Sequence, residues 1–253
     1  MAIPKILVKG VSKKYNGTPA LDVVDLQCEK RSFTCLLGPS GCGKSTLLNM
    51  IAGFVRPSTG QILVDNIPVS GADADRGMVF QEYALFPWRT ALENIKFGPM
   101  IKRMPPARQD EVGRKYLNLV GLSGRENAYP RELSGGMKQR VAIARALAND
   151  PSVLLMDEPF GALDAQTRET LQEELLTIWQ KERRTIVFVT HSVSEAIFLA
   201  DQVVVMATRP GAIREIIQID MPHHRDRNSP AFREIEQYVH RIMRDEVKKL
   251  GVS

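Results

Sequence analysis

The clearest chemical feature of the sequence is the glycine-rich segment GPSGCGKS at positions 38–45. It matches the pattern GxxxxGK[ST], with an apolar run before it and apolar residues at helical spacing after it. Glycine lets the backbone wrap closely around a phosphate, and the N–H groups of the loop and of the helix start face the anion. We expect Lys44 to reach the β- and γ-phosphates of a nucleoside triphosphate and the Ser45 hydroxyl to bind Mg²⁺. The predicted phosphate-binding residues are Gly38, Pro39, Ser40, Gly41, Cys42, Gly43, Lys44, Ser45 and Thr46.

Two adjacent carboxylates follow an apolar run at positions 153–156. Asp157 stands where a buried strand would end, so its side chain can bind the magnesium shell directly or through water. Glu158 is then placed to orient and polarise the water that attacks the terminal phosphate. The same two acids could instead merely cap the end of a strand. Together with the loop at 38–45, they predict hydrolysis of a triphosphate.

Length and composition are those of an ordinary globular protein. The chain has 253 residues, 43% of them hydrophobic and 25% charged, with a formal net charge of +5. Because acidic and basic residues are interspersed, this balance favours a solvated surface over a partner of opposite charge. No apolar run approaches the roughly 20 residues that a membrane-spanning helix needs, and residues 1–5 lack the features of a signal peptide. Cys28, Cys35 and Cys42 lack metal-site spacing, so we expect a reducing, cytoplasmic compartment.

Short apolar runs alternate with helical patterns along the chain, which predicts an α/β fold with a parallel sheet covered by helices. We expect strands at residues 6–8, 33–37, 153–156, 186–189 and 203–206. We expect helices at residues 44–53, 167–181 and 192–200. Apart from Thr34, the strand candidates are apolar, which is typical of strands buried on both faces.

Two segments depart from this alternation. Residues from about 87 to 148 are mainly helical in period and punctuated by prolines, so we interpret them as a helical subdomain inserted into the α/β core. A polar linker follows Pro222 and leads to an amphipathic helix, whose apolar positions are Phe232, Ile235, Val239, Ile242 and Val247. Their helical spacing favours a packing role. The expected division is a domain at 1–222 and a short C-terminal segment at 223–253.

The segment LSGGM at positions 133–137, ahead of a long helical run, narrows the fold family. Ser-Gly-Gly before a helix is by itself a common N-terminal cap. Here it resembles the signature motif LSGGQ of ATP-binding-cassette (ABC) proteins, with Met137 in place of the usual glutamine. The resemblance implies that Ser134, Gly135 and Gly136 contact the γ-phosphate of ATP bound to a second copy. It also implies that ATP and Mg²⁺ bind at the loop 38–45.

Further residues stand in the order found in ABC proteins. Gln81 is similar to the glutamine that contacts magnesium and water, His191 to the histidine that contacts the γ-phosphate, and Tyr15 to the aromatic residue that stacks on adenine. Asp164 resembles the aspartate of the loop that couples the two sites of a dimer. A lone histidine after a strand is more often structural, but the shared order of the motifs supports the resemblance. The implied fold is a P-loop NTPase (RecA-like) core with an antiparallel β portion and an inserted helical subdomain, of the ABC ATPase type.

A cassette of this length without membrane spans resembles importer ATPases, and the segment ALFPWR at 84–89 resembles the nitrate/sulfonate/taurine branch. The implied system contains a homodimer or paired ATPase subunit, integral membrane permease subunits and, indirectly, a periplasmic solute-binding protein. This places the chain at the cytoplasmic face of the inner membrane. The ATPase of a lipid or lipoprotein exporter, an iron–sulfur assembly ATPase and a non-transport ATP-dependent switch stay open as alternatives. Nucleic acid is not an expected partner, because the sequence shows no basic stripe with interleaved aromatics.

The dipeptide Pro87-Trp88 is informative because the resemblance implies that it lies near the permease. An exposed Trp88 would be an anchor for a helix of the partner. A packed Trp88 would instead belong to the core of the helical subdomain. The sequence leaves both interpretations open, and it leaves the transported solute open as well.

Overall fold

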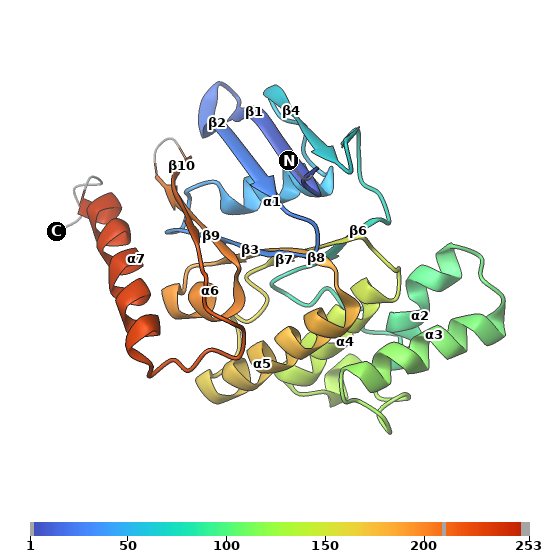
Figure 1. Ribbon diagram of the computed structural model, residues 1–253. Helices are drawn as coiled ribbons and strands as arrows, with labels where there is room; N and C mark the ends of the chain where they lie inside the picture. Colours follow the sequence, from blue (N-terminus) through green and yellow to red (C-terminus); the bar gives the residue numbers. More distant parts are fainter. Residues whose placement is uncertain (1–2, 209–210, 249–253) are drawn as a thin grey trace. The chain divides into compact units, whose positions relative to one another are not determined.

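A computed structural model describes residues 3–208 and 211–248 of the chain (Figure 1). The chain divides into two units, Met1–Asp73 with Arg184–Ser253 (unit 1) and Ala74–Arg183 (unit 2). In the sequence, unit 2 is therefore a continuous stretch inserted between the two stretches of unit 1. Residues 1–2 and 209–210 of the predicted domain at 1–222, and residues 249–253 of the predicted C-terminal segment, lie outside the described part.

Unit 1 contains an antiparallel sheet. Its strands, in spatial order, are β2 (Thr18–Cys28), β1 (Ile6–Tyr15), β4 (Thr59–Val64) and β5 (Ile67–Pro68). Asn16 and Gly17 join β1 to β2 with φ of 48° and 82°, as in the two-residue turn that matches the twist of a hairpin. Buried and exposed residues intermix along β1 and β2, because one face of the sheet is packed and the other is solvated.

A second sheet of unit 1 carries the strand that leads into the phosphate loop. Its strands in unit 1 are, in spatial order, β10 (Ala212–Gln218), β9 (Gln202–Ala207), β3 (Phe33–Leu37) and β8 (Thr185–Thr190). β3 pairs parallel with both β8 and β9, and every residue of β3 is buried. The strands expected at 33–37, 186–189 and 203–206 are confirmed. The half-exposed β10 pairs antiparallel with β9 and was not indicated by an apolar run.

The helices of unit 1 connect or cover these strands (Figure 1). They are α1 (Lys44–Ala52), α6 (Val193–Leu199) and α7 (Pro230–Lys248). α7 contacts α6 and β9, with Phe232 and Val239 only 1% and 0% exposed. This agrees with the packing role expected for the C-terminal helix. Ile235 and Ile242 are half-buried, and the side chain of Val247 lies outside the described residues.

Arg225 fixes the linker before α7 to the core of unit 1. The side chain is 6% exposed. Its guanidinium donates hydrogen bonds to the carbonyl oxygens of Ile197 and Ala200, the latter at 2.7 Å, and to that of Met221 at 2.8 Å. The first two carbonyls belong to the C-terminal end of α6, where carbonyls have no partner within the helix. Arg225 thus caps α6 from a segment far along the chain.

Unit 2 is mainly helical. Its elements in chain order are β6 (Arg76–Val79), α2 (Ala91–Ile101), α3 (Pro106–Leu119), the 3₁₀ turn η1 (Pro130–Glu132), α4 (Gly135–Leu147), β7 (Val153–Asp157) and α5 (Ala165–Glu182). The three helices α2, α3 and α4 fall within the stretch 87–148 that the sequence predicts to be helical. Unit 2 is wider than this predicted subdomain, because α4 also contacts β6 and α5. A capping box at Thr90 and Glu93 begins α2, and it satisfies backbone N–H groups at the helix start.

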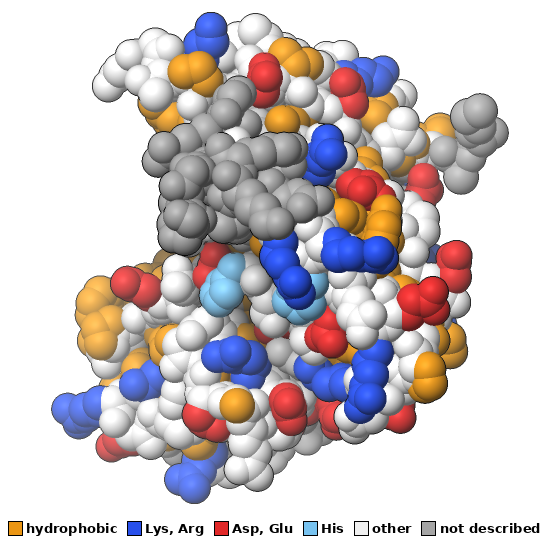
Figure 2. All heavy atoms as spheres, turned by 90° about the vertical axis from the view of Figure 1, so that its left-hand side faces the viewer, with side chains coloured by type: hydrophobic (Ala, Val, Ile, Leu, Met, Phe, Trp, Pro, Cys, Tyr) orange, Lys and Arg blue, Asp and Glu red, His pale blue; other side chains and the backbone are white. Residues whose placement is uncertain are grey.

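The hydropathy of the helices and the distribution of surface charge agree with what the composition predicts. Among the described residues, no helix has the length and apolar character to cross a membrane. Figure 2 shows one face of the molecule, on which Lys and Arg side chains alternate with Asp and Glu side chains. Charges of both signs are thus interspersed on this face.

We expect Arg225→Ala to lower the free energy of unfolding by about 2–3 kcal/mol, because it leaves buried carbonyls of α6 without a charged donor. Chemical denaturation followed by circular dichroism measures this change. Arg233→Ala is the matched control, since exposed Arg233 makes a long 3.5 Å bond to Asn228. That control should change stability by less than about 0.5 kcal/mol. Equal effects of the two substitutions would contradict the capping role of Arg225.

Candidate phosphate and nucleotide site

The phosphate loop of unit 1 runs from the end of β3 into α1. Gly41 and Gly43 have φ of 79° and 88°, in the left-handed region that favours glycine. A Cβ at Gly38 would lie 2.7 Å from the Sγ of Cys42 and 2.8 Å from the carbonyl oxygen of Met206. No larger residue fits at Gly38 without a shift of backbone. The loop therefore needs glycine at these positions.

Lys44 is held over the loop by the loop itself. The side chain is buried, and its Nζ donates to the carbonyl oxygens of Gly38 at 2.8 Å and Pro39 at 2.9 Å. The helix α1 begins at Lys44, and its N-cap Gly43 offers no side chain to the first N–H groups. An ammonium group and the positive end of a helix thus face the same loop. This combination binds a phosphate anion.

Cys42 is a packing residue of this loop. The thiol is 0% exposed, and its Sγ lies 3.8 Å from the Nζ of Lys44. Burial raises the pKa of Cys42, against the opposing effect of the Lys44 ammonium. A thiol with a raised pKa stays protonated near neutral pH and is a poor nucleophile. Cys42 stands at a variable position of the motif GxxxxGK[ST], and its side chain packs inside the loop.

The predicted magnesium ligands of each unit carry hard oxygen donors. Ser45 is exposed at the start of α1 and Thr46 is half-buried. Within residues 3–208 and 211–248, no cluster of three or more His, Cys, Asp or Glu side chains could hold a metal. Mg²⁺ does not need such a cluster, because it takes one or two protein oxygens, waters and substrate phosphates. The oxygen atoms of Ser45, Asp157 and Gln81 are ligands of this hard type.

His191 lies at the same edge of the unit 1 sheet as the phosphate loop. β3 and β8 are parallel, with Leu37 paired to Thr190, so the residues that follow the two strands emerge at one end. The turn after β8 is ordered by Thr190, whose Oγ1 accepts from the Ser192 N–H at 3.0 Å and donates to Glu195. His191 itself is exposed. The structure thus brings the predicted histidine to the phosphate-loop edge.

Tyr15 lies at the end of β1, on the hairpin whose second strand touches the phosphate loop. A Cβ at Gly43 would be 2.9 Å from the Cδ1 of Leu21 in β2. The ring of Tyr15 is 46% exposed, and the Lys13 Nζ lies 4.9 Å from its centroid. A lysine over one face leaves the opposite face of the ring available to a planar base. Stacking on adenine stays a prediction.

In unit 2, parallel pairing gathers the predicted catalytic side chains. β6 pairs with β7, with Val79 opposite Met156, so Gln81, Asp157 and Glu158 follow their strands at one edge. A Cβ at Gly161 would lie 3.6 Å from the Gln81 Nε2 and 3.9 Å from the Glu158 Cβ. Gln81 and Glu158 therefore meet at the same glycine. Glu158 has φ of 42°, a strained backbone of the kind found at functional sites.

The signature segment forms the tightly packed start of α4. Ser134 is the N-cap, and its Oγ accepts a hydrogen bond from the Met137 N–H at 3.3 Å. A Cβ at Gly136 would lie 2.8 Å from the Cγ2 of Thr167 in α5, and a Cβ at Gly135 would lie 3.2 Å from the hydroxyl oxygen of Tyr83. Glycine at these two positions lets the helix start approach its neighbours closely. The predicted contact with a second nucleotide stays a prediction.

Asp164 caps α5 at its N-terminus. Its Oδ1 accepts from the Thr167 N–H at 2.9 Å. Hydrogen bonds from the backbone and hydroxyl of Thr167 lower the pKa of Asp164, so this carboxylate is ionised at neutral pH. The signature segment and the Asp164 loop thus share a neighbour in Thr167. Coupling between two copies through Asp164 stays a prediction.

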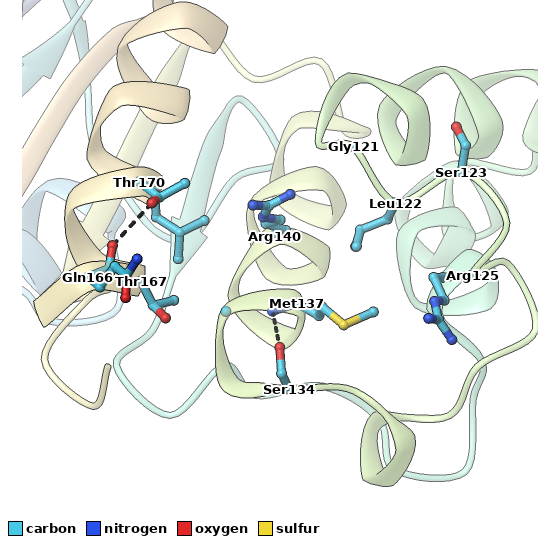
Figure 3. Close-up of a pocket in the computed structure, with 12 residues that line it drawn as sticks. Gly121, Leu122, Ser123, Arg125, Ser134, Met137, Arg140, Gln166, Thr167 and Thr170 are labelled. Atoms are coloured by element: carbon cyan, nitrogen blue, oxygen red, sulfur yellow. Dashed lines mark hydrogen bonds between the residues drawn. The ribbon is translucent and has the colours of Figure 1, made fainter. Parts of the chain in front are cut away.

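A cavity of about 470 Å³ lies beside the signature segment (Figure 3). It is lined by Gly121, Leu122, Ser123, Arg125, Ser134, Gly136, Met137, Arg140, Gln166, Thr167, Thr170 and Leu171. Figure 3 shows the Met137 side chain on the Arg125 side of α4 and the polar side chains of α5 on the other side. Arg140 bonds to Glu174 at 2.7 Å. The surface next to Ser134 is therefore concave, and its lining mixes polar and apolar side chains.

Sequence reasoning missed the residues that shape the segment after Gln81. Arg145 donates to the carbonyl oxygens of Tyr83 and Ala84, and Asn94 is fully buried against the same segment. The available signal was an arginine inside the apolar helical run VAIARAL at 141–147. A charged residue in such a run needs a polar partner.

Comparison with known families and proteins shows extensive similarity. The family model described as ABC transporter matches residues 21–161. An uncharacterized ABC transporter ATP-binding protein of Methanocaldococcus jannaschii is 53% identical over 97% of this chain and 93% of its own length. A taurine import ATP-binding protein of Yersinia pestis is 50% identical over 84% of each chain. An aliphatic sulfonates import ATP-binding protein of Bacillus cereus is 46% identical over 91% of each chain.

Solved structures show the same fold. A dimeric ATP-binding cassette in a post-hydrolysis state, bound to ADP and Pi, has a TM-score of 0.74 and 33% identity, over 86% of this chain and 100% of that chain. A component of an ABC transporter complex from Clostridium perfringens has a TM-score of 0.80 and 26% identity, over 95% of this chain and 98% of that chain. The α/β cassette fold expected from the sequence is therefore confirmed.

We expect Gly136→Ala to destabilise unit 2 by about 1–3 kcal/mol, because the new methyl group meets the Cγ2 of Thr167. Thr167→Ser removes that carbon and keeps the hydroxyl. The double variant Gly136→Ala with Thr167→Ser should therefore recover most of the loss. Denaturant unfolding of the two single variants and the double variant measures the coupling. Strict additivity of the two single effects would contradict the proposed contact.

Proposed function

This chain belongs to the ABC transporter family, and we propose that it is the ATP-hydrolysing subunit of an importer for taurine or another aliphatic sulfonate. ATP hydrolysis coupled to transport is the activity of the family, so the chain is an enzyme. The proposed solute class rests on relatives named for import of taurine and of aliphatic sulfonates. Nitrate, which the sequence resemblance also allows, is a small anion, as the sulfonate group is anionic.

The observation that carries the proposal is the loop 38–45 of unit 1. It joins three properties at one place: glycines that no larger residue can replace, a helix start without a side-chain cap, and a buried Lys44 ammonium. Each favours a phosphate group, and together they favour the charged tail of a nucleotide. A strand–loop–helix of this kind positions ATP for hydrolysis when a carboxylate base is also available.

We assign the hydrolytic roles residue by residue. Lys44 and the N–H groups at the start of α1 bind the β- and γ-phosphates. Glu158 accepts a proton from a water whose oxygen attacks the γ-phosphorus, while the bond from that phosphorus to the ADP oxygen breaks. Gln81 orients this water, and His191 holds the γ-phosphate. Mg²⁺, with Ser45, Gln81 and Asp157 as ligands, supplies charge neutralisation of the phosphates.

A second copy, or a paired ATPase subunit, completes the site in this proposal. Ser134, Gly135 and Gly136 of one copy bind the γ-phosphate held by the other through the N-terminus of α4. Asp164 connects the two sites. Support comes from the similar cassette that forms a dimer with ADP and Pi. Closure on ATP then assembles the catalytic residues, and hydrolysis releases them.

The proposed partners are integral membrane permease subunits, with a periplasmic solute-binding protein acting through them. The chain then works at the cytoplasmic face of the membrane. Trp88 is the proposed anchor, because its side chain is 71% exposed and its ring lies 5.7 Å from that of Phe86. Exposed aromatic residues of this kind dominate interface energies. Relatives named as import proteins favour this function over lipid export or iron–sulfur assembly.

We expect Glu158→Gln to bind ATP, to accumulate as a closed dimer and to lower the rate of ATP hydrolysis by about 10²–10⁴-fold, since the general base is lost. Phosphate release and size-exclusion chromatography with ATP measure the two effects. Glu169→Gln makes the same chemical change at an exposed position of α5, and it should leave the rate of hydrolysis and the dimer population unchanged. Normal steady-state hydrolysis by Glu158→Gln would refute the role of Glu158.

We expect Trp88→Ala to weaken assembly with the permease about 10-fold or more, as loss of a hot-spot aromatic does, while ATP binding is spared. Co-purification of the transporter from membranes measures assembly, and thermal unfolding of the isolated chain measures stability. Val23→Ala is the control, because Val23 is also exposed, at 59%, but lies in unit 1. A lowered melting temperature with unchanged assembly would show a packing role instead.

A further inference from the structure

The segment that follows Gln81 has a strained backbone. Tyr83 and Ala84 are consecutive, and their φ values are 56° and 49°. Residues with a Cβ rarely adopt this left-handed conformation, and an adjacent pair of them persists only where the surroundings hold it. The strained pair stands between Gln81, which we assign to hydrolysis, and Trp88, which we assign to the permease. What holds the pair therefore matters for both functions.

Arg145 is the side chain that holds the strained pair. Its two terminal nitrogens donate to the carbonyl oxygens of Ala84 at 2.5 Å and Tyr83 at 3.0 Å. The planar guanidinium fork places both donors in fixed geometry, which a flexible ammonium group does not do. Arg145 is half-buried in α4, so its position is set by the packing of that helix.

The backbone of the next part of the segment is fixed by different contacts, although the Arg145 guanidinium also lies over the Phe86 ring, 5.8 Å from its centroid. The buried Asn94 side chain accepts from the Phe86 N–H at 2.9 Å and donates to the carbonyl oxygens of Phe86, Arg89 and Thr90. The Phe86 ring also packs against that of Phe97, with 4.6 Å between centroids. From Phe86 onward, the backbone is therefore anchored to α2. The part that depends on Arg145 is residues 82–85.

The side chain of Tyr83 lies against the start of α4, at the opposite end of the helix from Arg145. Its hydroxyl oxygen would lie 3.2 Å from a Cβ at Gly135, in the signature segment. Gly135 and Arg145 are ten residues apart on one helix, which spans about 15 Å at 1.5 Å per residue. The strained segment therefore lies along α4, with Tyr83 against its start and its carbonyl oxygens on Arg145 near its end.

We propose that Arg145 is a positioning residue that locks residues 82–85 in their strained conformation, so that Gln81 and the permease-facing Trp88 move as one body with the signature helix. The inference rests on the roles that we propose for Gln81, Trp88 and Ser134. It deepens them by naming the contact through which they communicate. Arg145 touches neither ATP nor the permease, and it acts through the backbone of Tyr83 and Ala84.

Hydrogen exchange of the full-length chain tests the lock without reference to function. In Arg145→Ala, peptides that cover residues 82–85 should exchange about 10-fold faster or more, while the amide of Arg89, which bonds to Phe86, keeps its protection. Arg140→Ala is the matched control, because it removes another arginine of α4 that bonds to Glu174 and the Val120 carbonyl. Equal exchange of residues 82–85 in wild type and Arg145→Ala would overturn the proposal.

A second-site change separates positioning from simple helix packing. Ala84→Gly removes the steric cost of positive φ at that residue. In Arg145→Ala we expect kcat for ATP to fall about 10-fold with KM nearly unchanged, because a displaced Gln81 affects the reaction step and not the phosphate loop. Arg145→Ala with Ala84→Gly should regain most of kcat. A packing defect in α4 would give no such rescue, and that result would overturn the proposal.

Hydrogen exchange and the kcat of ATP hydrolysis distinguish failure of this inference from failure of the proposed function. A wild-type chain that hydrolyses no ATP would refute the proposed function, while hydrogen exchange still decides whether Arg145 locks the segment. Faster exchange of residues 82–85 together with an unchanged kcat in Arg145→Ala would overturn the positioning role and leave the ATPase assignment intact.

Discussion

Parallel pairing of strands is the constraint on which the candidate site depends. In unit 1, β3 and β8 run side by side, so the phosphate loop and His191 emerge at the same end. In unit 2, β6 and β7 do the same for Gln81 and the carboxylates after β7. A parallel ladder fixes this arrangement through its backbone hydrogen bonds, whatever the side chains are. Residues distant in sequence thus become neighbours because each follows a strand directly.

Close backbone approach is the second requirement, and glycine alone meets it. Gly38 faces the Cys42 sulfur and a Met206 carbonyl, and Gly136 faces the Thr167 methyl group. At both places the missing Cβ lets a helix or loop pack without displacing its neighbour. N–H groups at a glycine-rich loop and at the start of a helix are suited to phosphate. The tight fit and the anion site are therefore consequences of the same residue choice.

Three residues beside the predicted chemistry have a strained backbone. Glu158, Tyr83 and Ala84 have positive φ although each carries a Cβ. The hydrogen bonds of Arg145, and the one that the Gly161 N–H donates to the Glu158 carbonyl oxygen at 3.1 Å, offset this cost locally. A fold tolerates such conformations only where surrounding contacts over-determine them. The segment after Gln81 and the turn at Glu158 are thus held by specific contacts and not by regular secondary structure.

Much of the fold, and the candidate residues for the site, could be predicted from the sequence, because they depend on local signals. The run at 33–37 is apolar except for Thr34 and forms a strand with these bounds, and the glycines and Lys44 of the next loop belong to a recognisable motif. The antiparallel strands gave a weaker signal. Half of β4 is exposed and β10 alternates between half-buried and exposed residues, so neither has the continuous apolar run that marks a central strand.

The sequence by itself determined the chemistry, since the phosphate loop, the acidic pair and the signature segment are contiguous motifs whose residue types dictate what they bind. Only the tertiary structure decided how these motifs are held. It exposed Trp88 rather than packing it, placed Gln81 beside Glu158 at Gly161, and brought Arg145 onto the carbonyl groups of Tyr83 and Ala84, sixty-one and more residues away in the chain. Such contacts join residues that are distant in sequence, and no local pattern encodes them, because they arise from the packing of helices and loops against one another.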